Sequence, residues 1–250
     1  MRKYHSYEEL LKNNRDWVKT KKANDPGFFK RLSEGQKPPY LILGCADSRI
    51  PIDTFMQVEP GEFFVHRNIA NLISVTDMNF LSVLEYAVNY LNVEHIIICG
   101  HTHCGGIAAS YKSQCEGLVR NWTTPIKDLI ADHKKMLNQI PSMEARLNKI
   151  SELNVIAQAK NLFKISAIRN KIKSGHRYPK IHGWLLNLED GHIQIVRLPM
   201  KTWKKTGIIP ANYCHEIPSP CKIYSEHRIF THTHRPLRSR TTRPKLAPVK

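Results

Sequence analysis

The sequence predicts an α/β fold, with a mostly parallel central sheet flanked by helices, on a chain of 250 residues. Short apolar runs with the length of buried strands alternate along the chain with segments of helical periodicity. Two of these runs are followed directly by cysteine, histidine or charged residues, as expected where parallel strands end at a ligand site. Late in the pattern, a Glu-Asp-Gly turn joins two strands into an antiparallel hairpin at one edge of the sheet.

The first 38 residues or so are expected to form an N-terminal helical arm that precedes the first strand. Ser6 and Glu9 have the spacing of a capping box, and apolar residues with helical spacing follow them. A second short helix is expected from Gly27 to about Ser33. The apolar stripe of the arm could pack on its own domain or on a second subunit, and the sequence favours neither.

Strands and helices are then expected to alternate. The expected strands are residues 41–43, 63–66, 96–99, 180–186 and 192–196. Helices are expected after Pro51, over about 77–91, from Cys104, near 123–138 and near 143–172. Proline suits the first turn of a helix, and Ser74 and Asp77 are N-capping residues.

Residues 198–250 are expected to form a disordered, basic, Pro- and His-rich tail, which leaves residues 1–197 as the folded domain. The formal net charge of the chain is +17, and this segment holds 11 of the 38 Lys and Arg residues but 2 of the 21 Asp and Glu residues. It has many prolines and few, scattered apolar residues, so burial of its side chains would not offset the conformational entropy lost on ordering. Its histidines, such as His232 and His234, have no spacing that fixes a metal site.

The charge raises nucleic acid as a partner, but its concentration in the tail makes a solvated terminus the simpler interpretation. The alternative from a different functional class is nucleic-acid binding through the tail, and an affinity that falls steeply with salt concentration would identify it. No membrane association is expected, because no apolar run reaches spanning length and the N-terminus lacks a signal-peptide core. Six cysteines without disulfide-like spacing favour a reducing cytoplasm.

Cys45, His101 and Cys104 are candidate zinc ligands. His101 and Cys104 are three residues apart after one strand, and Cys45 follows another. Two thiolates and one imidazole fill three positions, which is the catalytic pattern of zinc rather than the closed structural one. A structural zinc would need a fourth ligand, for which His103 or Cys99 can be nominated. Ordinary loop and core residues are the remaining interpretation.

Asp47 and Arg49 follow Cys45 and can project together from an extended loop. The guanidinium fork would then hold the carboxylate in a fixed orientation. Such a pair is usually a structural ion pair, but beside a metal it can orient the water that the metal activates.

Three motifs together resemble the β-class carbonic anhydrases, and the resemblance runs from about residue 5 to residue 197. They are Cys45-x-Asp47-Ser48-Arg49, the segment from Glu59-Pro60-Gly61-Glu62 through His66-Arg67-Asn68-x-Ala70-Asn71, and Gly100-His101-x-x-Cys104-Gly105-Gly106. The resemblance implies reversible hydration of carbon dioxide to bicarbonate with one Zn²⁺ per chain. It also implies a homodimer or homotetramer in which the N-terminal helices wrap the partner subunit.

Carried over residue by residue, the resemblance implies that Cys45, His101 and Cys104 bind the metal, and that Asp47 and Arg49 form a catalytic dyad. Hydrolysis of carbonyl sulfide or carbon disulfide on the same scaffold is the alternative activity.

One bacterial branch of this family holds regulatory bicarbonate in a pocket of Trp, Arg and Tyr. Arg67 matches that pocket, but Ile42 and Leu186 stand at the aromatic positions, so we expect no such pocket here. The segment after residue 197 departs from the family pattern.

Overall fold

The computed structural model describes residues 5–175, 179–211 and 213. Its five-stranded sheet has the order β2-β1-β3-β4-β5. The strands are β1 (Tyr40–Cys45), β2 (Phe63–Asn68), β3 (His95–His101), β4 (Lys180–Leu186) and β5 (Ile193–Val196). All neighbouring pairs are parallel except β4 and β5, which form the expected antiparallel hairpin. The predicted α/β class and mostly parallel sheet are confirmed.

The helices before β3 are α1 (Tyr7–Asn24), α2 (Phe28–Ser33), α3 (Ile52–Met56), the 3₁₀ turn η1 (Ile69–Asn71), α4 (Met78–Glu85) and its continuation η2 (Tyr86–Tyr90). Those between β3 and β4 are α5 (Gly105–Tyr111), α6 (Gly117–Trp122), α7 (Thr124–Asp132), α8 (Lys134–Asn138), α9 (Met143–Leu162) and α10 (Ser166–Lys173). The single helix expected near 143–172 is therefore two helices. The break contains Ile165, whose extended backbone forms the N-cap of α10.

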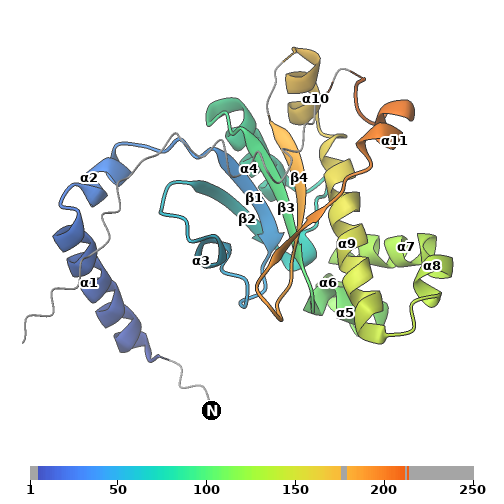
Figure 1. Cartoon of the computed structure of the whole chain (residues 1–250), viewed down its shortest axis with the longest axis horizontal. Helices are drawn as coiled ribbons and strands as arrows, with labels where there is room; N and C mark the ends of the chain where they lie inside the picture. Colours follow the sequence, from blue (N-terminus) through green and yellow to red (C-terminus); the bar gives the residue numbers. More distant parts are fainter. Residues whose placement is uncertain (1–4, 176–178, 212, 214–250) are drawn as a thin grey trace, which may run out of the picture. The chain divides into compact units, whose positions relative to one another are not determined.

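Both faces of the sheet are buried, which explains the continuous apolar runs of its strands. Leu41 and Leu43 of β1 belong to one core cluster, with residues of α4, α9 and α10. Ile42 of the same strand belongs to the other, with residues of α3, α5 and α7. Figure 1 shows α9 running along the sheet, where it contacts β3 and β4. The carboxyl ends of β1 and β3 thus lie at one edge of a sheet that is fixed on both sides.

The N-terminal arm begins as predicted. The Ser6 side chain accepts a hydrogen bond from Glu9 N, and Glu9 Oε2 accepts one from Ser6 N, which completes the capping box. Helix α1 has no buried residue. Its Lys21 pairs with Glu59 at 2.7 Å, which joins the arm to the turn before β2.

The predicted boundary at residue 197 is wrong. Helix α11 (Met200–Lys205) follows β5, and Trp203, Ile209 and Tyr213 belong to the core cluster that contains α9. Trp203 and Tyr213 each pack edge-on against Phe163 at the end of α9. These side chains supply the burial that orders a segment without periodicity. The remainder of the expected tail, including His232 and His234, lies outside the described residues.

Within the described part of the chain, no helix is both long and apolar enough to cross a membrane.

Candidate metal centre

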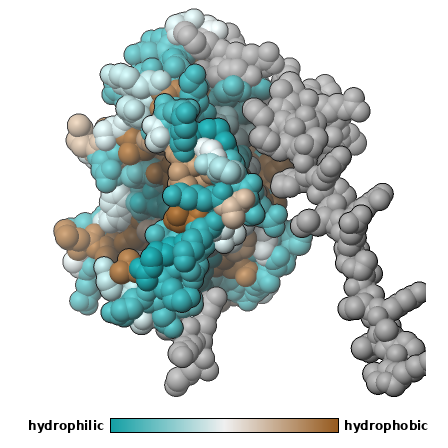
Figure 2. Space-filling model, turned by 90° about the vertical axis from the view of Figure 1, so that its left-hand side faces the viewer, coloured by the Kyte–Doolittle hydropathy of each residue, from teal (hydrophilic) through white to brown (hydrophobic). Residues whose placement is uncertain are grey.

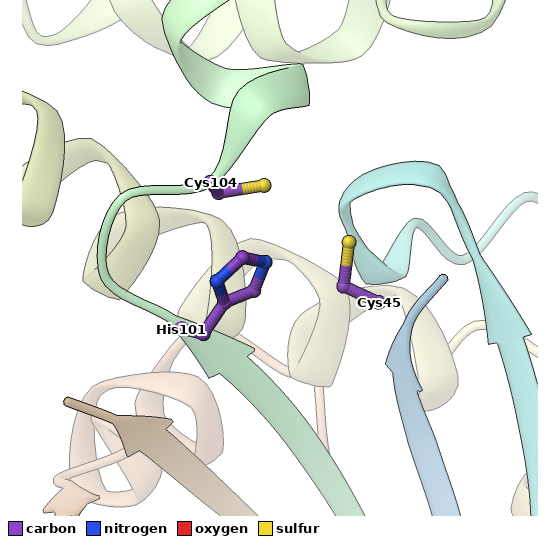
Figure 3. Close-up of side chains that lie close together, drawn as sticks. All are labelled: Cys45, His101 and Cys104. Atoms are coloured by element: carbon purple, nitrogen blue, oxygen red, sulfur yellow. The ribbon is translucent and has the colours of Figure 1, made fainter. Parts of the chain in front are cut away.

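The three candidate ligands come together at the carboxyl edge of the sheet. Cys45 ends β1, His101 ends β3, and Cys104 is the N-cap of α5. Because β1 and β3 are parallel neighbours, their last residues meet at the same edge. One donor atom from each of the three side chains lies within 4.8 Å of the others. Figure 3 shows the three side chains pointing into one space.

His101 presents one ring nitrogen to this space. The side chain is fully buried, and Nδ1 lies 2.8 Å from the carbonyl oxygen of Thr102. Nδ1 therefore carries the proton and donates it to that carbonyl, which leaves Nε2 as an acceptor. Nε2 is buried and has no hydrogen-bond partner among the described residues. An orphaned buried acceptor is costly, and a metal ion beside the two thiols would satisfy it.

The two thiols lie in hydrogen-bond contact. The hydrogen bond with Cys104 lowers the pKa of Cys45 to about 4, and the backbone N–H groups of Asp47 and Ala70 act in the same direction. The pKa of Cys104 is raised by the same contact and by burial. One thiolate is thus favoured before any cation is present, and a divalent cation would favour the second. Two sulfurs and one imidazole nitrogen are the soft and borderline donors that suit zinc.

Asp47 lies beside this group and forms a bidentate salt bridge with Arg49. Arg49 Nε donates to Asp47 Oδ1 at 2.9 Å, and Arg49 Nη2 donates to Oδ2 at 2.7 Å. Asp47 Oδ2 lies 4.0 Å from His101 Nε2. The Arg49 guanidinium lowers the pKa of Asp47 to about 2. The expected fork is therefore present, and the carboxylate is ionised beside the three candidate ligands.

The two nominated fourth ligands do not join the group. Cys99 lies in β3 and is buried, and burial raises its pKa to about 12. His103 has a left-handed backbone with φ of 55°, and its Nε2 lies 3.1 Å from Glu189 Oε1. Its ring forms a separate exposed group with Glu144 and Glu189. Among the described residues, the Cys-His-Cys group thus has three members, which argues against a closed structural site.

The space beside Arg67 is too small for a bound anion of the regulatory kind. It is a cavity of about 10 Å³ that Ile42, Cys45 and Cys99 help to line, which is room for at most about one water molecule. Arg67 Nε donates to the carbonyl of Cys45 at 2.7 Å, and its Nη2 donates to that of Asp47 at 2.6 Å. Arg67 therefore braces the loop that carries Cys45 and Asp47.

Sequence reasoning missed the contacts behind Cys45. Ala70 N–H donates to Cys45 Sγ at 3.3 Å, and Ala70 O accepts from Asn154 Nδ2 at 2.9 Å. Ala70 has φ of 61°, which nothing in its residue type predicts. A signal for Asn154 exists, however, because Asn154 and Gln158 put two amides at i, i+4 on the buried face of α9.

Comparison with known proteins agrees with this geometry. The family model described as carbonic anhydrase matches residues 40–193. A carbonic anhydrase of Emericella nidulans is 40% identical over 186 residues, which cover 74% of this chain and 81% of that protein.

Solved structures give the same result. A tetrameric β-carbonic anhydrase of Sordaria macrospora is 38% identical, with a TM-score of 0.73 over 76% of this chain and 96% of that one. A Coccomyxa β-carbonic anhydrase, solved in complex with acetazolamide, is 29% identical, with a TM-score of 0.74 over 81% of this chain and 92% of that one. The chain belongs to the β-class carbonic anhydrases.

Proposed function

We propose that this protein catalyses the reversible hydration of carbon dioxide to bicarbonate and a proton, with one Zn²⁺ per chain held by Cys45, His101 and Cys104. The observation that carries the proposal is the orphaned Nε2 of His101. It is buried, faces two thiols of which one has a pKa lowered to about 4, and has no hydrogen-bond partner among the described residues. A set of two sulfurs and one nitrogen leaves one coordination position for chemistry. A zinc ion held there would supply a water-derived nucleophile near neutral pH.

Asp47 orients the attacking water in this proposal. Its carboxylate is fixed at both oxygens by Arg49 and is held at its own backbone carbonyl by Arg67. Because its pKa is lowered to about 2, the carboxylate accepts a hydrogen bond but is too weak a base to keep a proton at neutral pH. Asp47 therefore aims the water at carbon dioxide, and the released proton passes to buffer.

We also propose that the active unit is a homodimer or a homotetramer. The related enzyme of Sordaria macrospora is tetrameric. In this chain α1 has no buried residue, and its Tyr7, Leu10, Leu11 and Trp17 are exposed. The face shown in Figure 2 carries apolar patches between hydrophilic residues. Exposed apolar side chains on a helix that has no buried residue support packing against a second subunit.

Metal content and turnover, measured on the same preparation, test the proposal. We expect one zinc per chain by elemental analysis and rapid carbon dioxide hydration by stopped-flow. Cys104→Ser should lose both together, because a hydroxyl is a poor zinc ligand. Cys115→Ala is the matched control, since Cys115 is another buried cysteine but lies outside the ligand group. Full zinc and turnover in Cys104→Ser would refute the ligand assignment.

Hydrolysis of carbonyl sulfide is the competing activity on this scaffold. Both substrates are linear and are attacked at carbon, so the group at Cys45, His101 and Cys104 suits either. The same metal-loaded protein should therefore be assayed with carbon dioxide and with carbonyl sulfide. The proposal expects a much higher kcat/KM for carbon dioxide, and the reverse ratio would replace it with the hydrolase activity.

A further inference from the structure

The loop after β2 adopts a strained backbone directly behind Cys45. Ala70 and Asn71 have φ of 61° and 46°, in the left-handed region that residues with a Cβ rarely occupy. Both residues are buried. The result of this turn is that Ala70 N–H points at Cys45 Sγ, 3.3 Å away. Strain at a buried turn persists only where its surroundings fix it, so the groups that hold Ala70 matter.

A row of buried amides on α9 fixes this loop. Asn154 Nδ2 donates to Ala70 O at 2.9 Å, and Gln158 Nε2 donates to Asn154 Oδ1 at 2.8 Å. Gln158 Oε1 in turn accepts from Ile73 N at 2.8 Å, at the far end of the same loop. Asn154 and Gln158 are 2% and 3% exposed. Buried amides are kept in a core only when their hydrogen bonds are satisfied, and here both amides are satisfied by each other and by the loop.

Two other side chains bind this loop. Trp122 Nε1 donates to Ile69 O at 2.9 Å, and this carbonyl belongs to the same peptide group as the Ala70 N–H. Asn161 Nδ2 donates to Ile73 O at 3.2 Å. Asn154 binds the carbonyl of Ala70, which belongs to the following peptide group. Trp122 and Asn154 therefore hold the peptide groups on the two sides of Ala70, and the backbone conformation that points its N–H at Cys45 depends on both.

We propose that Asn154, oriented by Gln158, acts with Trp122 as a positioning residue that keeps the Ala70 N–H on the Cys45 thiolate and thereby tunes that sulfur as a metal ligand. This inference rests on the proposed function, because it needs Cys45 to bind zinc. A hydrogen bond to a thiolate withdraws electron density from the sulfur. Two thiolates donate more charge to a metal than two imidazoles do, and this N–H offsets part of that donation.

Cobalt substitution reports on the sulfur directly. Asn154→Leu keeps the volume of the side chain but removes its hydrogen bonds, and Asn161→Leu is the matched control on the same helix and loop. We expect the thiolate-to-cobalt charge-transfer band of Asn154→Leu to move to lower energy, because an unbonded sulfur is easier to oxidise. Zinc should also pass to a chelator about tenfold faster than in the wild type. Asn161→Leu should lose stability but keep the wild-type band and the wild-type rate of zinc loss.

Gln158→Met is a second and milder variant, which leaves Asn154 in place but removes the amide that orients it. Its charge-transfer band should move in the same direction by a smaller amount. An unchanged band in metal-loaded Asn154→Leu, or an equal shift in Asn161→Leu, would overturn the positioning role and leave the proposed function intact. Failure of the wild type to bind zinc or cobalt would overturn both proposals.

Discussion

Gly100 lies where α9 crosses β3. Replacing it with alanine tests how closely α9 packs against the sheet beside the candidate metal centre. A Cβ at Gly100 would lie 2.6 Å from Cγ2 of Val155 on α9 and 3.6 Å from the backbone oxygen of Ser151. A Cβ at Gly183, on β4, would lie 2.8 Å from Cγ1 of the same valine. Val155 thus fills the space above both glycines, and it cannot move away because it is fully buried.

The expected cost follows from this geometry. Gly100→Ala forces one methyl group into a packed core, and such overpacking costs about 1–3 kcal/mol of unfolding free energy. Val155→Ala removes two methyl groups and leaves a cavity, at a cost of about 2–3 kcal/mol. In the double variant the new methyl group occupies part of that cavity. The two losses should therefore not add, and we expect a compensating coupling energy of about 1–2 kcal/mol.

Urea unfolding of the four proteins, at one fixed protein concentration, measures this coupling. Gly105→Ala is the control for glycine replacement itself, because its Cβ would meet nothing within 4 Å. It should change stability little. Since Gly100 adjoins His101, the single variant should also hydrate carbon dioxide more slowly, and the second substitution should restore part of the rate. Strictly additive losses would show that Val155 does not crowd Gly100 and would refute this account of the helix–sheet contact.

Four further outcomes are expected. Asp47→Asn should retain zinc but lose hydration activity by about a hundredfold or more in stopped-flow assays, because an amide presents an acceptor at one position only. Trp203→Ala should lower the unfolding free energy by about 3–5 kcal/mol in urea, since Trp203 is buried in the core. Added bicarbonate should give no cooperative inhibition of turnover, because the cavity beside Arg67 has no room for it. Burial lowers the pKa of His95, so the unfolded chain binds a proton at this histidine at a higher pH than the folded protein does. The free energy of unfolding should therefore fall as the pH drops below about 6.5, and His95→Gln should make this fall less steep when melting is measured across pH.

The sheet and the proximity of the three candidate ligands could be predicted because both depend on local patterns and one topological rule. The apolar runs before Cys45 and His101 specify buried strands, and parallel strands end at a common edge. The meeting of Cys45 and His101, 56 residues apart in the sequence, therefore follows without any knowledge of side-chain packing. The fork of Asp47 and Arg49 is local in the same sense, because the two residues are neighbours in one loop.

Two features could not be predicted, because each depends on contacts distant in sequence. Trp203, Ile209 and Tyr213 have no helical or strand periodicity, so only their burial against Phe163 and the sheet shows that they belong to the domain. The left-handed turn at Ala70 contradicts its residue type, and it is fixed by Asn154, which lies 84 residues away. Propensity is a weak guide where tertiary hydrogen bonds decide the backbone.

The charges at the site give a reason why the proposed function would need Arg49 as well as Asp47. Two thiolates would neutralise a divalent zinc ion, so an unpaired Asp47 would add a net negative charge and discourage loss of a proton from water. Arg49 removes that charge while its fork still holds both carboxylate oxygens in place. Arg67 fixes the same loop through backbone carbonyls and adds a second positive charge nearby. In the proposed function, the two arginines would therefore let the Asp47 carboxylate orient water beside a thiolate-rich metal site without making that site more negative.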